Sequence, residues 1–275
     1  VEPARRALAA RPDDPALGNA LASILLCAGR PDEAWPVIRR LRERDPAALE
    51  PIAHEAVAAR LLADPGYARL YDFERFVRPY DLEPPAGYAS MQEFNAALAE
   101  LLESRHRFDA HPLDQSLRSG TQTAGNLLGD PHPLIQAFVA AIEAPIADYR
   151  AAVGRDPAHP LEARNLGESA IDSGWSVRLR RGGFHVNHIH PAGWLSSAYY
   201  VHTPADVADV EAKSGWIKFG EPRFPVPGAL PERIIQPRPG RLVLFPSYMW
   251  HGTTPITTDE PRLTIAFDVV TKPAN

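Results

Sequence analysis

The hydrophobic pattern of this chain changes its period partway along the sequence. Up to about residue 64, and again in two segments before residue 154, apolar residues recur every three or four positions, which is the spacing of an amphipathic helix. From Trp175 onward, apolar and polar residues alternate, as in a β-strand with one buried face. Helices first and a run of short strands afterwards predict an α+β protein rather than alternating βαβ units.

The first 70 residues are predicted to be helical. Residues 4–64 are rich in Ala, Leu, Arg and Glu, and Pro12-Asp13 is followed thirty-four positions later by Pro46-Ala47. This period resembles that of tetratricopeptide helix pairs. We therefore expect residues 1–70 to form a tetratricopeptide-like segment and residues 71–275 to form a second domain. An ordinary helical hairpin without repeat ancestry is the alternative for the first segment.

The second domain is predicted to be built mainly from short strands. Long connections rich in proline separate them, a pattern typical of an antiparallel sandwich or barrel. Helices over about 90–106 and 131–153 would pack on this jelly roll. The predicted strands are one within 73–82, then Trp175–Arg180, Gly183–His190, Leu195–His202, Gly215–Phe219, Arg241–Phe245 and Leu263–Val270.

Composition narrows the partners and the environment. The net charge of -5 and the pI near 6.1 provide no basic field for nucleic acid or anionic lipid. No apolar run approaches the roughly 20 residues of a membrane span. Cys27 is the only cysteine, which rules out an intramolecular disulfide and a cysteine-based metal site. We expect a soluble cytoplasmic protein in which histidines and carboxylates hold any metal.

Three histidines form a candidate metal site. His188 and His190 are two positions apart in a predicted strand, so both side chains project to one face, and Pro191 favours extended backbone before it. His251 from a distant strand would complete a set that leaves open positions on an octahedral metal. His185 could replace His190 only if a bulge rotated the strand. The alternative is that these histidines only form hydrogen bonds.

Arg262 stands at the start of an otherwise apolar predicted strand. An unpaired buried charge costs several kcal/mol, and the planar guanidinium matches a carboxylate with two parallel hydrogen bonds. Its partner is therefore expected to be an anionic ligand, or else an internal acid at the rim of the barrel.

These motifs, in this order, resemble a known enzyme family. Four parts carry the resemblance: Gly182–Val201, Gly215–Phe219, Pro239–Ser247, and His251 with Arg262. Together they resemble the iron(II)- and 2-oxoglutarate-dependent oxygenases, in particular a group that often follows tetratricopeptide repeats. The upstream stretch Leu113–Thr123 fits the same group, so the resemblance covers about residues 75–270.

The resemblance implies a double-stranded β-helix that binds one Fe(II) and uses 2-oxoglutarate as cosubstrate. His188 and His251 match iron ligands, and His190 stands where the wider superfamily usually has Asp or Glu. Weaker candidates are Asn187 near the metal, and Trp194, Trp250 and Lys218 at the substrate mouth. The residues that would bind the cosubstrate are Arg262, Tyr200, Thr264 and Ser197.

The expected function is hydroxylation by a 2-oxoglutarate-dependent dioxygenase. Helical repeats present concave surfaces to peptide segments, so a peptide or protein side chain is the first substrate expected, with a small molecule as the alternative. The histidine at position 190 keeps two further functions open. One is a non-catalytic metal- or ligand-binding jelly roll with a helical interaction module, and the other is a three-histidine cupin-like dioxygenase that does not use 2-oxoglutarate.

Overall fold

The computed structural model describes residues 1–108, 110 and 115–273. Leu113 and Asp114, which belong to the stretch that resembles the oxygenases, lie outside the described residues. Within the described ranges, no helix combines the length and apolar character that spanning a membrane requires.

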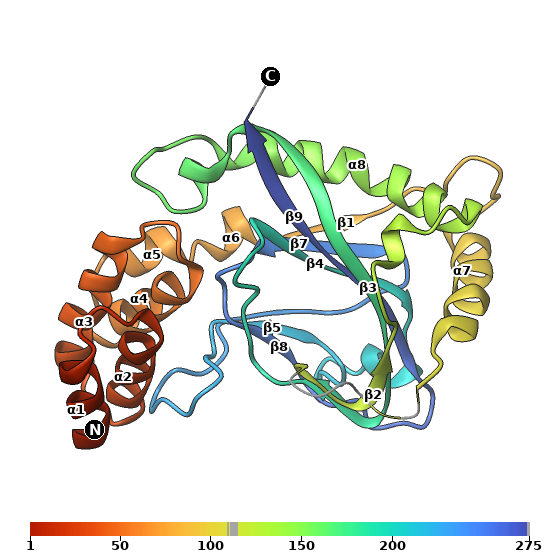
Figure 1. Ribbon diagram of the computed structural model, residues 1–275. Helices are drawn as coiled ribbons and strands as arrows, with labels where there is room; N and C mark the ends of the chain where they lie inside the picture. Colours follow the sequence, from red (N-terminus) through yellow and green to blue (C-terminus); the bar gives the residue numbers. More distant parts are fainter. Residues whose placement is uncertain (109, 111–114, 274–275) are drawn as a thin grey trace.

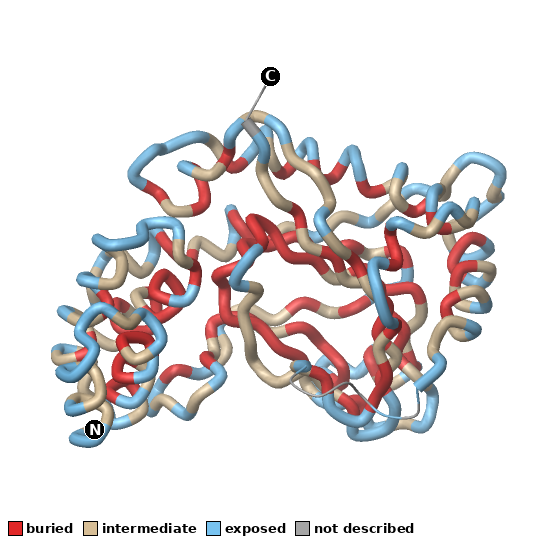
Figure 2. Tube along the Cα trace, in the orientation of Figure 1, coloured by how far each residue is buried: buried red, intermediate tan, exposed pale blue. Residues whose placement is uncertain are grey.

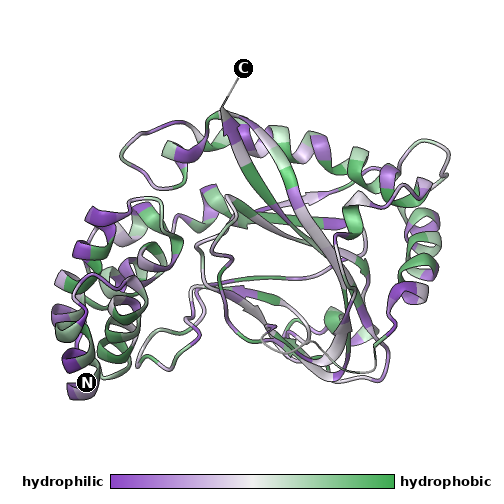
Figure 3. Cartoon of the chain, viewed as in Figure 1, coloured by the Kyte–Doolittle hydropathy of each residue, from purple (hydrophilic) through white to green (hydrophobic). Residues whose placement is uncertain are grey.

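The helical segment is present where the sequence predicts it. Its helices stack beside the sheets (Figure 1), and α3 carries mainly polar residues on its outer side, coloured purple in Figure 3. Asp14 caps α2 by accepting hydrogen bonds from two backbone N–H groups of its first turn, which is a common way to begin a helix. The tetratricopeptide ancestry stays a prediction. The helices are α1 (Glu2–Ala10), α2 (Pro15–Cys27), α3 (Pro31–Arg44), α4 (Leu49–Leu61) and α5 (Gly66–Leu70).

Two antiparallel sheets face each other and form a double-stranded β-helix (Figure 1), which confirms the expected α+β class and jelly roll. The large sheet has the order β1-β7-β4-β9-β3-β2 and the small sheet the order β6-β5-β8. The large-sheet strands are β1 (Arg78–Asp81), β2 (Leu117–Gln122), β3 (Gly167–His185), β4 (Leu195–His202), β7 (Arg241–Pro246) and β9 (Arg262–Pro273). The small-sheet strands are β5 (Ile217–Phe219), β6 (Arg233–Ile235) and β8 (His251–Thr253).

Helices cover the outer face of the large sheet. The Ser90 side chain caps α7 by accepting a hydrogen bond from the backbone N–H of Glu93. Phe138 of α8 packs against Tyr199 of β4, with ring centroids 4.8 Å apart. The remaining helices are α6 (Phe73–Phe76), α7 (Met91–Arg105) and α8 (Pro133–Val153), with 3-10 turns at Leu127–Gly129, Glu162–Arg164 and Ala205–Ala208.

Three predictions about strands need correction. The strand expected within 73–82 is present only as β1, from Arg78 to Asp81. Residues 73–76 form helix α6 instead, whose N-terminus is capped by the Asp72 side chain, which accepts a hydrogen bond from the backbone N–H of Arg75. Two strands predicted between Trp175 and His190 are a single strand, β3, which ends at His185. The sequence analysis also missed β2, β6 and β8, which are polar or only three residues long.

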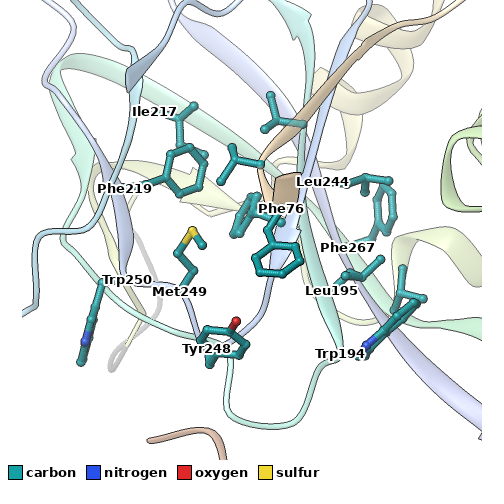
Figure 4. Packing of buried hydrophobic residues seen from close by; sticks show 14 of the residues in the cluster. Phe76, Trp194, Leu195, Ile217, Phe219, Leu244, Tyr248, Met249, Trp250 and Phe267 are labelled. Carbon is teal, nitrogen blue, oxygen red and sulfur yellow. The ribbon is translucent and has the colours of Figure 1, made fainter. Parts of the chain in front are cut away.

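One hydrophobic core joins the helical segment to the sheets. Buried residues are concentrated in α2, α4 and the strands of both sheets (Figure 2). The contact between the two parts includes Trp250, whose indole N–H donates to the backbone oxygen of Ala53 in α4 at 3.2 Å. Figure 4 shows Tyr248, Met249 and Trp250 in this core with Phe219. The chain segment that leads into His251 is therefore packed against the helices.

Candidate metal centre

A cavity of about 1110 Å³ opens between the two sheets. Residues from β3, β4, β8 and β9 line it together with residues from α2 and α4. All three predicted metal ligands border it, together with Arg262, Tyr200 and Thr264. The structure thus brings together the residues that the sequence placed far apart.

Backbone hydrogen bonds hold the histidines in position, although β3 ends before them. His188 and His251 form an isolated bridge, with N···O distances of 2.8 and 3.1 Å. The backbone N–H of His190 donates to the carbonyl of Ser247 at 2.9 Å. Gly252 permits this close approach, since a Cβ atom there would lie 2.4 Å from the side-chain oxygen of Asn187.

Each imidazole of the triad is fixed by an acceptor at its Nδ1 atom. The Nδ1 of His188 lies 2.9 Å from the Val186 carbonyl, and that of His251 lies 2.9 Å from the Met249 carbonyl. The Nδ1 of His190 lies 2.7 Å from a carboxylate oxygen of Asp268. Carbonyl and carboxylate oxygens only accept hydrogen bonds, so each Nδ1 carries the proton and each Nε2 retains a lone pair.

The three Nε2 lone pairs converge, as a metal site requires. The potential ligand atoms of the triad all lie within 4.8 Å of one another, and the Nε2 atoms of His188 and His190 are only 3.1 Å apart. Two unprotonated nitrogens cannot hydrogen bond to each other, whereas a cation between them would bind both. Imidazole nitrogens suit iron, zinc, copper and nickel.

Burial keeps the imidazoles of His188 and His251 neutral. Loss of hydration, with a smaller contribution from the nearby His190, lowers the pKa of His188 to about 3. Burial likewise holds the pKa of His251 well below its ordinary value, with His188 and His190 adding to the effect. Metal binding requires the unprotonated ring, so both are ready to bind at neutral pH.

His185 lies beside the triad but outside it. Its ring stacks on His188 with centroids 5.9 Å apart. Its Nδ1 is 2.9 Å from the hydroxyl of Ser116, and the group of converging ligand atoms does not include it. The arrangement therefore favours His190 over His185 as the third ligand.

Asp268 is a site residue that the sequence analysis missed. Its oxygens lie 2.7 and 2.9 Å from the Nδ1 of His190, and it borders the cavity. The period-two alternation that pairs Arg262 with Thr264 on one face of β9 continues to Asp268. It is also the one charged residue in the predicted strand Leu263–Val270, a pattern that could have identified it.

Arg262 and Tyr200 offer unused hydrogen-bond donors beside the triad. Arg262 is 2% exposed, and one of its terminal nitrogens donates to the Gly215 carbonyl at 2.6 Å. Its Nε atom and the Tyr200 hydroxyl are buried without a partner in the described residues. No carboxylate of the described chain forms an ion pair with Arg262, so the internal acid considered for it is absent from that part.

Burial shifts both groups in the direction expected for unpaired side chains. It lowers the pKa of Arg262 and raises the pKa of Tyr200 to about 12. The guanidinium carbon lies 5.6 Å from the centre of the Tyr200 ring. Thr264 is paired with Tyr200 across β4 and β9, and its hydroxyl lies 3.4 Å from the Val177 carbonyl. A buried cation next to a free phenol is suited to an anionic ligand.

The other predicted side chains have different surroundings. The Ser197 hydroxyl donates to the Phe267 carbonyl at 2.9 Å and accepts from the Phe267 N–H at 2.8 Å, so its role toward a cosubstrate stays a prediction. Trp250 borders the cavity. The other three candidates have partners nearby in the protein. The Trp194 indole N–H donates to the Leu161 carbonyl, and the Asn187 amide donates to the Pro222 carbonyl. Lys218 forms an ion pair with Glu221.

The fold and this site define a class: a jelly-roll protein in which three converging histidines share a cavity with a buried arginine that has no acid partner in the described residues. Residues 173–268 match the family described as "Putative 2OG-Fe(II) oxygenase". This segment, about a third of the chain, is therefore similar to the 2-oxoglutarate and iron(II) oxygenases. No curated protein matches the chain.

Several solved structures are similar to the chain. A prolyl-4-hydroxylase from Pseudomonas putida is 14% identical, with 74% of this chain and 96% of that chain covered and a TM-score of 0.45. HygX from Streptomyces hygroscopicus, solved with nickel and 2-oxoglutarate bound, is 13% identical, with 74% and 86% covered and a TM-score of 0.49. A viral collagen prolyl hydroxylase from Paramecium Bursaria Chlorella virus-1, in complex with 2-oxoglutarate, is 13% identical, with 72% and 97% covered and a TM-score of 0.46.

The cofactors of this family are Fe(II) and 2-oxoglutarate, and the residues present fit both. Three converging imidazole nitrogens match a divalent iron ion. The unpartnered Nε of Arg262 and the unpartnered hydroxyl of Tyr200 match a carboxylate of the cosubstrate.

Proposed function

We propose that the protein is an Fe(II)- and 2-oxoglutarate-dependent dioxygenase that hydroxylates a side chain of a peptide or protein. The observation that carries this proposal is that three bare imidazole nitrogens share one cavity with an arginine that has no acid partner in the described chain. His188, His190 and His251 would hold the iron. When bound, iron and 2-oxoglutarate supply oxidation by dioxygen, with succinate and carbon dioxide as co-products.

The chain's own residues orient the cosubstrate. Arg262 would pair with the carboxylate farthest from the metal, and the Tyr200 hydroxyl would donate a hydrogen bond to the same group. Thr264 lies next to them on the cavity face of β9. Because Arg262 is almost fully buried, little water competes for it, which strengthens such a pair. The opposite end of the ligand would then be directed toward the histidines.

The lining of the cavity supports a peptide or protein substrate. Besides the histidines, it is bordered by Ser23 of α2, by Glu50 and His54 of α4, and by Arg223 and Phe224 of the β5–β6 loop. This loop, in light blue in Figure 1, extends toward the helices, and the Arg60 side chain of α4 donates to its backbone. An extended chain lying against these residues could direct one side chain to the metal centre.

Two features separate this function from its alternatives. A non-catalytic metal-binding jelly roll does not need a buried, unpaired guanidinium, and neither does a cupin-like dioxygenase that works without a keto acid. The Arg262–Tyr200 pair therefore favours the 2-oxoglutarate-dependent reaction.

The first experiment tests the cosubstrate. Purified protein with Fe(II), ascorbate and 2-oxoglutarate is expected to form succinate, slowly without a substrate. Arg262→Ala should weaken 2-oxoglutarate binding by at least about 30-fold, because removing one partner of a buried charge pair costs 2 kcal/mol or more, while metal binding is retained. Arg69→Ala, at an exposed arginine paired with Asp156, is the matched control.

The outcomes are distinct. Equal 2-oxoglutarate affinity in wild type and Arg262→Ala would overturn the assignment of Arg262. Absence of both 2-oxoglutarate binding and succinate formation would refute the enzyme proposal as a whole.

The second experiment tests the substrate class. Succinate formation is measured with a peptide fraction and with a small-molecule fraction of the same cell extract. We expect the peptide fraction to stimulate turnover and one peptide to gain a single oxygen atom by mass spectrometry. Stimulation by the small-molecule fraction alone would contradict a peptide or protein substrate.

A further inference from the structure

The proposed metal site contains no anionic ligand, yet a carboxylate lies directly behind one of its imidazoles. Three neutral rings leave the full double charge of a divalent ion uncompensated. Both oxygens of Asp268 face the Nδ1 of His190, at 2.7 and 2.9 Å. His188 and His251 have only neutral carbonyl oxygens at their Nδ1 atoms. The negative charge is therefore applied at one ring of the three.

We propose that Asp268 is the anionic group of the metal centre and acts through His190 as a positioning residue. The carboxylate fixes the Nδ1–H tautomer of His190, directs its Nε2 toward the ion and makes that nitrogen a stronger donor, as carboxylate–histidine–metal arrangements do. This inference rests on the proposed function. At the position where related enzymes usually have a carboxylate ligand, the negative charge would be one ring away from the metal rather than missing.

A buried chain of hydrogen bonds holds the Asp268 carboxylate in place. The Ser196 hydroxyl donates to it at 2.8 Å and lies 2.9 Å from the Ser247 hydroxyl. Both serines are 0% exposed. The backbone carbonyl of Ser247 also accepts from the N–H of His190. The same residues thus fix both the carboxylate and the backbone of the ring it supports.

The face of the His190 ring is restrained as well. Trp175 of β3 stacks on it with centroids 5.8 Å apart and an angle of 23° between the planes. With the ring plane set by Trp175 and its rotation set by Asp268, the Nε2 of His190 has one direction available, which is toward the Nε2 of His188 at 3.1 Å.

The test is a double-mutant cycle read out by metal binding alone. Co(II) is titrated into metal-free protein and followed by visible absorption, for wild type, Asp268→Ala, His190→Ala and the double variant. Asp268→Ala is expected to weaken Co(II) binding by about 10- to 100-fold, the usual effect of losing such a support. In the His190→Ala background, Asp268→Ala is expected to have no further effect, because the aspartate acts through the missing ring.

Asp268→Asn separates charge from orientation. Its amide oxygen can still accept from the Nδ1–H of His190, but the negative charge is gone. We expect a Co(II) affinity between those of wild type and Asp268→Ala, and an absorption band moved from its wild-type position. Asp172→Ala, at an exposed aspartate of β3, controls for the loss of a carboxylate elsewhere. Thermal melts of the metal-free variants confirm folding, and Asp268→Asn serves if Asp268→Ala does not fold.

The outcomes distinguish this inference from the proposed function. Co(II) binding by Asp268→Ala within twofold of wild type would overturn it, and so would additive losses in the cycle, which would show Asp268 acting independently of His190. If wild type itself binds no Co(II), the proposed metal centre is refuted, and the proposed function with it. If wild type binds Co(II) and His188→Ala does not, while Asp268→Ala is unchanged, only the role of Asp268 fails.

Discussion

Tyr200 carries a hydroxyl that the described fold leaves without a partner. The side chain is 0% exposed and its oxygen is unsatisfied, while its ring lies beside Arg262. A buried hydroxyl without a hydrogen bond costs about 1–3 kcal/mol. The arrangement is unfavourable in the free protein and becomes favourable when an anion accepts the hydrogen bond.

This leads to a prediction for Tyr200→Phe. The free energy of unfolding of the metal-free protein should be unchanged or slightly higher, because no protein hydrogen bond is lost. The affinity for 2-oxoglutarate should fall about tenfold, since a hydrogen bond to a charged group contributes roughly 1.5 kcal/mol. Urea unfolding and calorimetric titration measure the two quantities. A stability loss above about 1 kcal/mol would show that the hydroxyl already has a partner in the protein.

Individual site residues differ in how visible they are in the sequence. His188, His190 and Arg262 stand out because a charge or a metal-binding side chain interrupts an apolar or alternating pattern. Asp268 interrupts such a pattern equally, but it becomes meaningful only when β3, β4 and β9 bring it to His190. The contribution of Ser196 was similarly hidden, since neighbouring serines at 196 and 197 look alike until the strand places them on opposite faces.

At the scale of elements, the pairing of α2 with α4 depends on a buried neutral histidine. His54 is 1% exposed, and its Nε2 lies 3.0 Å from the Ser23 hydroxyl, which itself donates to the Asn19 carbonyl. His54 Nε2 must therefore be the donor. Burial lowers the pKa of His54 from 6.5 to about 4, so protonation opposes the packing of the two helices.

The chain is therefore predicted to lose stability on acidification through His54. Below pH 6.5 the unfolded chain takes up a proton that the folded chain excludes until about pH 4, so stability falls with pH across this window. At pH 5 the loss should be about 2 kcal/mol. Urea unfolding at pH 7 and at pH 5 measures this loss. Between these two pH values, the free energy of unfolding of His54→Gln should fall by correspondingly less than that of wild type. His202→Gln, at a histidine beside Glu260, should behave like wild type, and equal losses in all three proteins would contradict the prediction.

Elements with a strong period were predictable, and those made by tertiary pairing were not. α7, α8 and β4 have clear helical or alternating patterns, and β4 has the predicted bounds. β8 has only three residues, and His188 is held beside it by a single bridge outside any long strand. The strand predicted through His190 was wrong because its backbone bonds to Ser247 rather than to a continuing ladder.

For the whole molecule, the shared core predicts one cooperative unfolding transition. Trp250, Ala53 and the residues around them belong to a single hydrophobic cluster. Calorimetry of the full chain should give equal calorimetric and van't Hoff enthalpies, and a protein reduced to residues 71–275 should melt at a lower temperature. Two separate transitions, with the second unchanged in residues 71–275, would contradict this. The division at residue 70 stays a prediction about sequence organisation.

The position of Trp250 has an evolutionary consequence. This residue donates a hydrogen bond from its indole N–H to the α4 backbone and directly precedes His251, a proposed metal ligand. Descendants could remodel the part of the cavity lining formed by Ser23, Glu50 and His54, and so acquire new targets, while inheriting the proposed metal centre intact. They would have to conserve Trp250, because its loss would disturb both the helical part of the cavity lining and the position of His251.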